Sequence, residues 1–88
     1  MKLKEDLVLR QVARSWVVIP VADRTLDFSG ILSLNDSGAM LWNVLKDHGD
    51  RDALIAALTE KYDVSAQIAG NDVDAFIDKL MKAGCFEE

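Results

Sequence analysis

The feature that most constrains the fold of this chain is one change in the spacing of its apolar residues, at Asn35. Before that point, segments 7–13 and 15–21 are short and rich in β-branched and aromatic residues, with only a tight turn between them. Such segments are typical of β-strands, and their closeness predicts an antiparallel hairpin. Pro20 has no N–H to donate, so it fits the end of the second strand. After a polar connection over 22–30, we expect a third strand at 31–34.

After Asn35 the apolar residues recur at intervals of three and four, which predicts three helices. Residues that cap helix starts and glycines that end helices divide this part of the chain. The expected starts are Asn35 or Asp36, Asp50, and Ser65 or Asn71, and the expected ends are His48–Gly49, Asp63–Ser65 and Gly84. We expect Trp42 and Phe76 to belong to the core, and Phe86 to fold back onto it.

Three strands followed by three helices predict an α+β fold, in which a three-stranded antiparallel sheet carries the helices on one face. This arrangement is similar to a winged helix-turn-helix. With 88 residues, the chain is expected to form one domain over 1–88, since there is no room for a separate catalytic lobe. So small a sheet leaves an edge unpaired, and an exposed edge must be either protected or used.

The composition narrows the class of protein. Half of the residues are hydrophobic and 28% are charged, which is a globular balance. No apolar run approaches the roughly 20 residues of a membrane helix. The start of the chain mixes both charge signs and is unlike a secretory signal. A single cysteine agrees with a reducing compartment, so we expect a cytoplasmic protein that does not associate with membranes.

Groups that carry catalysis or bind metals are scarce. One histidine and one cysteine cannot supply a metal-ligand cluster. His48 and Cys85 fall at predicted helix ends, where structural roles fit them better than a nucleophile and its base. The five glycines do not form a phosphate-binding loop. We therefore expect no enzyme, no metal and no cofactor.

The charge distribution weighs against a nucleic-acid-binding winged helix, which is one alternative function. The net charge is −5, and residues 36–88 hold eleven acidic residues against five basic ones. Asp72 and Asp74 are expected near the start of the third helix, where they would stabilise the helix dipole. That start would approach a DNA groove, and its acidic character is wrong for binding phosphates.

The run Leu34-Asn35-Asp36-Ser37-Gly38-Ala39-Met40-Leu41-Trp42 resembles the L-N-[ED]-[TS]-[GA]-A-x-[LI]-[WL] signature that joins the third strand to the first helix in PqqD-like proteins. The resemblance extends over residues 7–86. Later positions that match in order are Leu54, Leu58, Tyr62-Asp63-Val64, Asp72-Val73, Phe76, Leu80 and Gly84.

One departure concerns the connection after Pro20. The pyrroloquinoline quinone members of the family have a short link with proline between strands two and three, whereas here segment 21–30 is longer. This difference favours a relative that serves another peptide product, including a lasso-type peptide.

The resemblance implies a RiPP recognition element, a non-enzymatic module that holds the leader segment of a ribosomally made precursor peptide. Such a module presents the leader to a modifying enzyme, often a radical SAM protein. The leader adds as an extra strand beside the third strand, in a cleft walled by the third helix. Main-chain hydrogen bonds then give affinity and side-chain pockets give selectivity. The candidate peptide-binding residues are Gly30, Ile31, Leu32, Ser33 and Leu34 of the strand, and Ile77, Asp78, Lys79, Leu80 and Met81 of the helix.

Several of these candidates also have structural interpretations. Strand alternation sends Leu32 and Leu34 to the same face, with Ser33 opposite. Ile77 and Leu80 fit the core equally well. Met81 lies off the main apolar face and is flexible, while Asp78 and Lys79 also fit a solvated helix surface. A third function remains open, in which the free edge pairs with a second copy of the chain and makes a homodimer.

Overall fold

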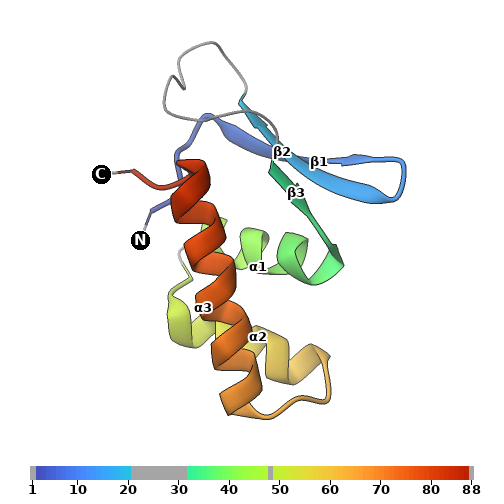
Figure 1. Cartoon of the computed structure of the whole chain (residues 1–88), viewed down its shortest axis with the longest axis vertical. Helices are drawn as coiled ribbons and strands as arrows, with labels where there is room; N and C mark the ends of the chain where they lie inside the picture. Colours follow the sequence, from blue (N-terminus) through green and yellow to red (C-terminus); the bar gives the residue numbers. More distant parts are fainter. Residues whose placement is uncertain (1, 21–31, 48, 88) are drawn as a thin grey trace.

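The computed structural model describes residues 2–20, 32–47 and 49–87. The described residues form strands β1 (Leu7–Val12), β2 (Ser15–Pro20) and β3 (Leu32–Leu34), which make one antiparallel sheet in the order β1-β2-β3 (Figure 1). Helices α1 (Asp36–Lys46), α2 (Arg51–Lys61) and α3 (Ala66–Ala83) follow. The predicted α+β fold, with strands before helices, is confirmed. The connection over 21–30, Ile31 and His48 lie outside the described residues.

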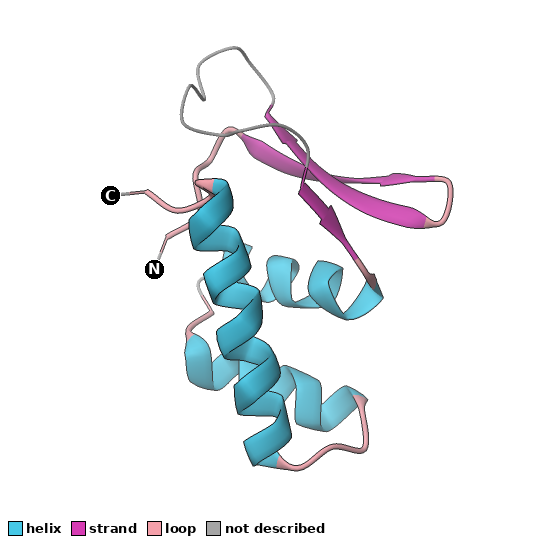
Figure 2. Ribbon diagram, viewed as in Figure 1, coloured by secondary structure: helices cyan, strands magenta, loops and turns pink. Residues whose placement is uncertain are grey.

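The helices lie together on one side of the sheet (Figure 2), and α2 packs against both α1 and α3. Alternation in β3 places Leu32 and Leu34 in the core and leaves Ser33 exposed, as predicted. Trp42 of α1 is also buried, at 1% exposure. Residues from every element meet in one cluster, which includes Leu7, Val18, Leu45, Leu54, Leu58, Ala69, Val73, Phe76 and Leu80.

Each helix begins at a polar side chain that accepts a hydrogen bond from the backbone N–H three residues later. The capping oxygens belong to Asn35, Asp50 and Ser65. Of the two starts considered for α3, Ser65 is therefore right and Asn71 is wrong, since α3 runs through Gly70 and Asn71 without interruption. The helix ends at Gly84, whose left-handed φ of 79° suits a residue without a side chain.

The early start of α3 overturns one sequence prediction. The first turn of α3 contains no acidic residue, because Asp72 and Asp74 lie more than one turn inside the helix. Asp74 instead accepts two hydrogen bonds from Arg51 at the start of α2, at 2.8 and 3.1 Å. The hydrogen bond from the Arg51 guanidinium lowers the pKa of Asp74. The Arg51–Asp74 ion pair thus joins α2 to α3, and Asp74 does not stabilise the start of α3.

The two ends of the described chain lie side by side (Figure 1). Leu3 and Phe86 form an antiparallel bridge, and the Lys4 amide donates to the Cys85 carbonyl at 2.9 Å. Phe86 packs against the core, as predicted. Burial of Cys85 raises the pKa of its thiol to about 11, so the thiol stays protonated and unreactive at neutral pH.

Candidate functional site

The outer edge of β3 is the first part of the candidate site. β2 is the central strand, so β1 and β3 form the two edges of the sheet. Across 2–20, 32–47 and 49–87, no strand pairs with β3 on the side away from β2. A free strand edge offers unpaired N–H and C=O groups.

The hairpin register identifies which β3 groups point to that edge. Val12 pairs with Ser15, so the loop has two residues and is closed by a hydrogen-bonded pair. Hydrogen bonding alternates along an antiparallel strand, which turns the backbone groups of Trp16 toward β3, where Trp16 pairs with Leu34. The same alternation directs the N–H and C=O of Ser33 away from β2, to the open edge.

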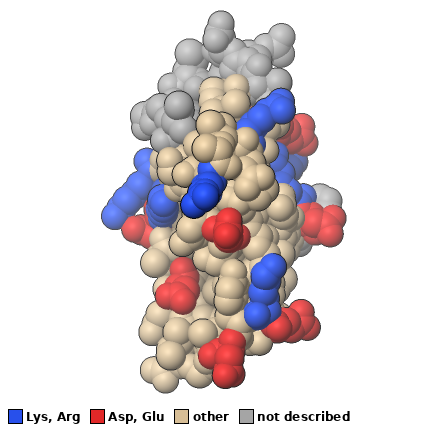
Figure 3. Space-filling model, turned by 90° about the vertical axis from the view of Figure 1, so that its right-hand side faces the viewer, with Lys and Arg blue, Asp and Glu red and all other residues tan. Residues whose placement is uncertain are grey.

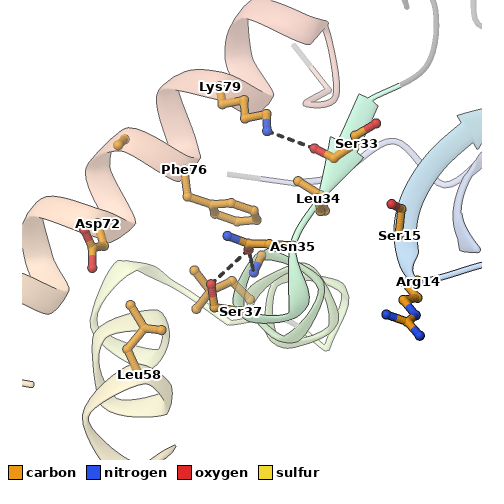
Figure 4. A pocket seen from close by; sticks show the side chains of 13 residues that line it. Arg14, Ser15, Ser33, Leu34, Asn35, Ser37, Leu58, Asp72, Phe76 and Lys79 are labelled. Carbon is orange, nitrogen blue, oxygen red and sulfur yellow. Dashed lines mark hydrogen bonds between the residues drawn. The ribbon is translucent and has the colours of Figure 1, made fainter. Parts of the chain in front are cut away.

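A lysine of α3 contacts this edge. The Nζ of Lys79 donates a hydrogen bond to the Ser33 carbonyl oxygen at 2.8 Å, across 46 positions of sequence (Figure 4). The contact agrees with the outward direction of the Ser33 carbonyl. Lys79 thus links the open edge to the helix that faces it.

A pocket of about 730 Å³ continues from this edge, between β3, the start of α1 and the faces of α2 and α3 (Figure 4). Leu34, Leu41, Leu58 and Phe76 give it apolar walls. Its polar side chains include two cations and one carboxylate, and its full lining is Arg14, Ser15, Ser33, Leu34, Asn35, Ser37, Gly38, Leu41, Leu58, Asp72, Ala75, Phe76 and Lys79. An apolar pocket with a few polar groups, beside a free strand edge, is suited to an extended peptide.

The segment that follows β3 forms one end of the pocket. The Asn35 side chain accepts hydrogen bonds from the Gly38 amide and the Ser37 hydroxyl, at 2.8 and 2.9 Å. A Cβ on Gly38 would lie 3.2 Å from both Asn35 Oδ1 and Leu34 Cβ, so glycine permits this tight turn. The Trp16 indole N–H donates to Asp36 at 3.0 Å and ties β2 to the start of α1.

The predicted site residues fall into four groups. Ser33, Leu34 and Lys79 line the pocket. Leu80 and Leu32 are buried in the core, and Ile77 packs against it. Asp78 and Met81 lie on the surface, Met81 at 64% exposure and Asp78 paired with Lys82 at 3.0 Å. Gly30 and Ile31 lie outside the described residues.

Apart from Ser33, Leu34 and Lys79, sequence reasoning named none of the pocket side chains as site residues, and it assigned Phe76 to the core alone. Ser37 and Gly38 carry a signal that could have found them, because they follow the third strand directly within the 34–42 run. Arg14 and Leu58 carry no such signal, since only the packing of the hairpin and α2 brings them to the pocket. No group of three metal-ligating side chains occurs within the described ranges. None of the helices described is long and apolar enough to cross a bilayer.

Fold and site together define a small domain of three antiparallel strands and three helices, with an open β3 edge beside a pocket. A family model described as coenzyme PQQ synthesis protein D (PqqD) matches residues 16–85. The chain therefore belongs to the PqqD family. A comparison with curated protein sequences finds no match.

Two solved structures are similar to this one over nearly their whole length. The first, described as TbiB1 in complex with the TbiA(beta) leader peptide, has a TM-score of 0.80 and 18% identity, covering 99% of this chain and 95% of that one. The second is a lasso peptide synthetase B1 complexed with the leader peptide. Its TM-score is 0.76 and its identity 23%, covering 96% of this chain and 93% of that one. At these identities the likeness concerns the fold.

Proposed function

We propose that this protein binds the leader segment of a ribosomally synthesised precursor peptide, and that the leader adds to the sheet as a strand beside β3. The observation that carries the proposal is the open β3 edge, with the Ser33 N–H and C=O directed outward. Main-chain pairing at this edge needs no particular peptide sequence, and the apolar side chains of the neighbouring pocket supply selectivity.

The β3 edge suits this role better than the β1 edge. Toward the hairpin turn, β1 presents the exposed side chains of Arg10 and Gln11, and a charged side chain such as that of Arg10 discourages pairing at an edge. The β3 edge instead faces α3 across the pocket, so a bound peptide would bury apolar side chains there. Leader peptides in the complexes named above support the same class of ligand.

The partner that receives the leader is a peptide-modifying enzyme, and the protein itself acts without catalysis. Its candidate site holds an amine, a guanidinium, a carboxylate and hydroxyls, without a nucleophile and base in contact among the described residues. Between the two enzyme classes considered, radical SAM proteins and lasso-peptide machinery, the second similar structure favours the lasso type.

The surface charge gives no support to the nucleic-acid alternative. Acidic and basic side chains are interspersed over the face shown in Figure 3, without a continuous basic patch on its described part. Phosphate binding depends on clustered lysine and arginine.

Isothermal titration of the protein with the leader peptide of the precursor encoded beside its gene tests the proposal. We expect saturable binding of one peptide per chain, and weak or no binding of a scrambled peptide of the same composition. Absence of binding at high micromolar concentration would contradict the proposal. A light-scattering measurement without peptide separates this function from a homodimer, in which the edge would already be occupied.

A further inference from the structure

We propose that Lys79 selects peptides that carry an acidic residue close to the position paired with Ser33. The inference rests on the proposed strand addition at β3, and it concerns which peptides that edge accepts. Lys79 acts as a specificity-determining residue, and its ammonium binds the Ser33 carbonyl of the β3 edge when no peptide is bound.

Lys79 and a peptide strand would both donate a hydrogen bond to the Ser33 carbonyl oxygen. Of the three residues of β3, only Ser33 directs its carbonyl outward, because outward and inward directions alternate. The Lys79 ammonium occupies that carbonyl at 2.8 Å. A strand that pairs with Ser33 donates its own N–H to the same oxygen and lies about 4.8 Å from β3, so the Lys79 ammonium has to move from its position on this carbonyl.

The Lys79 ammonium that contacts Ser33 has no carboxylate partner among the described residues. Within residues 2–20, 32–47 and 49–87, no salt bridge involves Lys79. Lys82, one turn further along α3, already pairs with Asp78 at 3.0 Å. A carboxylate on the peptide would therefore recover for Lys79 the charge-assisted hydrogen bond that it loses at Ser33. A peptide without an acidic side chain would displace Lys79 from Ser33 without giving its ammonium a new charge-assisted hydrogen bond.

The charges of Lys79 and Asp72 restrict where along the pocket an acidic residue of the peptide can lie. Lys79 lies at the β3 end, whereas Asp72 lines the pocket two turns earlier on the same helix. Two helical turns span about 11 Å, which corresponds to about three residues of an extended strand. Asp72 repels a carboxylate at its own end. The acidic side chain is therefore expected within one residue of the position paired with Ser33.

Selection from a display library of random peptides tests this inference without knowledge of the natural leader. The library is selected separately on the wild type, on Lys79→Met, on Lys79→Glu, on the control Lys82→Met, and on Arg14→Met, which removes the other cation of the pocket. We expect the wild type and the Lys82→Met control to enrich apolar, strand-forming peptides with Asp or Glu at one fixed position. Lys79→Met should keep the apolar preference and lose the acidic one, and Lys79→Glu should prefer Lys or Arg there.

Calorimetry on one selected peptide then measures the size of the effect. Replacement of its acidic residue by the neutral amide should weaken binding to the wild type about three- to tenfold, as expected for an ion pair that binding partly desolvates. The same replacement should leave the affinity for Lys79→Met unchanged. Thermal melting of each variant checks that all of them fold.

The outcomes separate this inference from the proposed function. If Lys79→Met retains the acidic preference, or if only Arg14→Met loses it, the role of Lys79 is overturned while peptide binding stands. If no form of the protein enriches any peptide, or if the selected peptides bind Ser33→Pro as well as the wild type, strand addition at β3 is overturned and the inference with it.

Discussion

Ala13 is the one described residue other than glycine with a positive φ, at 56°. It occupies the first position of the two-residue loop between β1 and β2, and a positive φ at that position alone defines a type II′ turn, which favours glycine. An L-residue with a side chain is strained in this conformation.

We therefore expect Ala13→Gly to raise the free energy of unfolding by about 0.5–1 kcal/mol. This value is the strain energy that glycine relieves minus the larger conformational entropy that glycine loses on folding. Urea denaturation measures the change. Ala56→Gly, in the exposed middle of α2, is the control and should cost about 1 kcal/mol. Equal losses in both variants would show that Ala13 is not strained.

Cys85 gives the protein a predictable response to alkaline pH. Burial raises the pKa of the folded thiol from 9.0 to about 11, so the unfolded chain loses this proton first as pH rises. The contribution of the neutral thiol to stability is therefore fully present below pH 9. Between about pH 9 and 11 the free energy of unfolding falls, by up to about 1.4 kcal/mol for each pH unit. In Cys85→Ala this part of the decline should vanish. A constant difference in unfolding free energy between the two proteins from pH 8 to pH 10 would refute the assignment.

At the scale of elements, β3 is short, and one residue in it carries the exposed pairing groups. Ser33→Pro removes the outward N–H while leaving the pairing of Leu32 and Leu34 with β2 in place. We expect loss of leader binding by calorimetry and retention of the helical signal in circular dichroism. Ser33→Ala keeps the N–H and should bind as the wild type does. Binding by the proline variant would place the leader on another surface.

The order of the elements and their ends could be predicted from the sequence because local signals set them. The Asn35, Asp50 and Ser65 caps and the Gly84 stop are read from neighbouring residues. The exact start of α3 could not be decided between two such signals, because burial of Ala69 and Gly70 against the rest of the molecule outweighs the cost of glycine inside a helix.

The candidate site was only partly predictable, because tertiary packing brings several of its side chains together and local sequence signals do not describe that packing. Ser33, Leu34 and Lys79 could be named from strand alternation and the family resemblance. The contact between Lys79 and Ser33 depends on the position of α3 beside β3, which no local pattern sets. Leu58 and Arg14 reach the pocket only through the packing of α2 and the hairpin turn.

At the scale of the whole molecule, one small core supports both the fold and the open edge. Trp42 is its largest fully buried side chain. Trp42→Ala should cost about 3–5 kcal/mol of unfolding free energy, a large share of the about 5–15 kcal/mol that a domain has. Guanidinium denaturation measures this loss. A cost below about 1 kcal/mol would contradict the central position of Trp42.

If the leader binds only the folded sheet, as proposed, leader binding and folding are linked. A saturating leader should therefore raise the melting temperature of the wild type in a concentration-dependent way and leave that of Ser33→Pro unchanged.

Amide hydrogen exchange followed residue by residue, with and without the leader peptide, tests the central claim most directly. If the leader adds as a strand at β3, the Ser33 amide exchanges freely in the absence of peptide and becomes protected when peptide is bound, while the outer amides of β1 do not change. Protection that appears on β1 alone, or a Ser33 amide that exchanges equally fast in the saturated complex, would contradict the account.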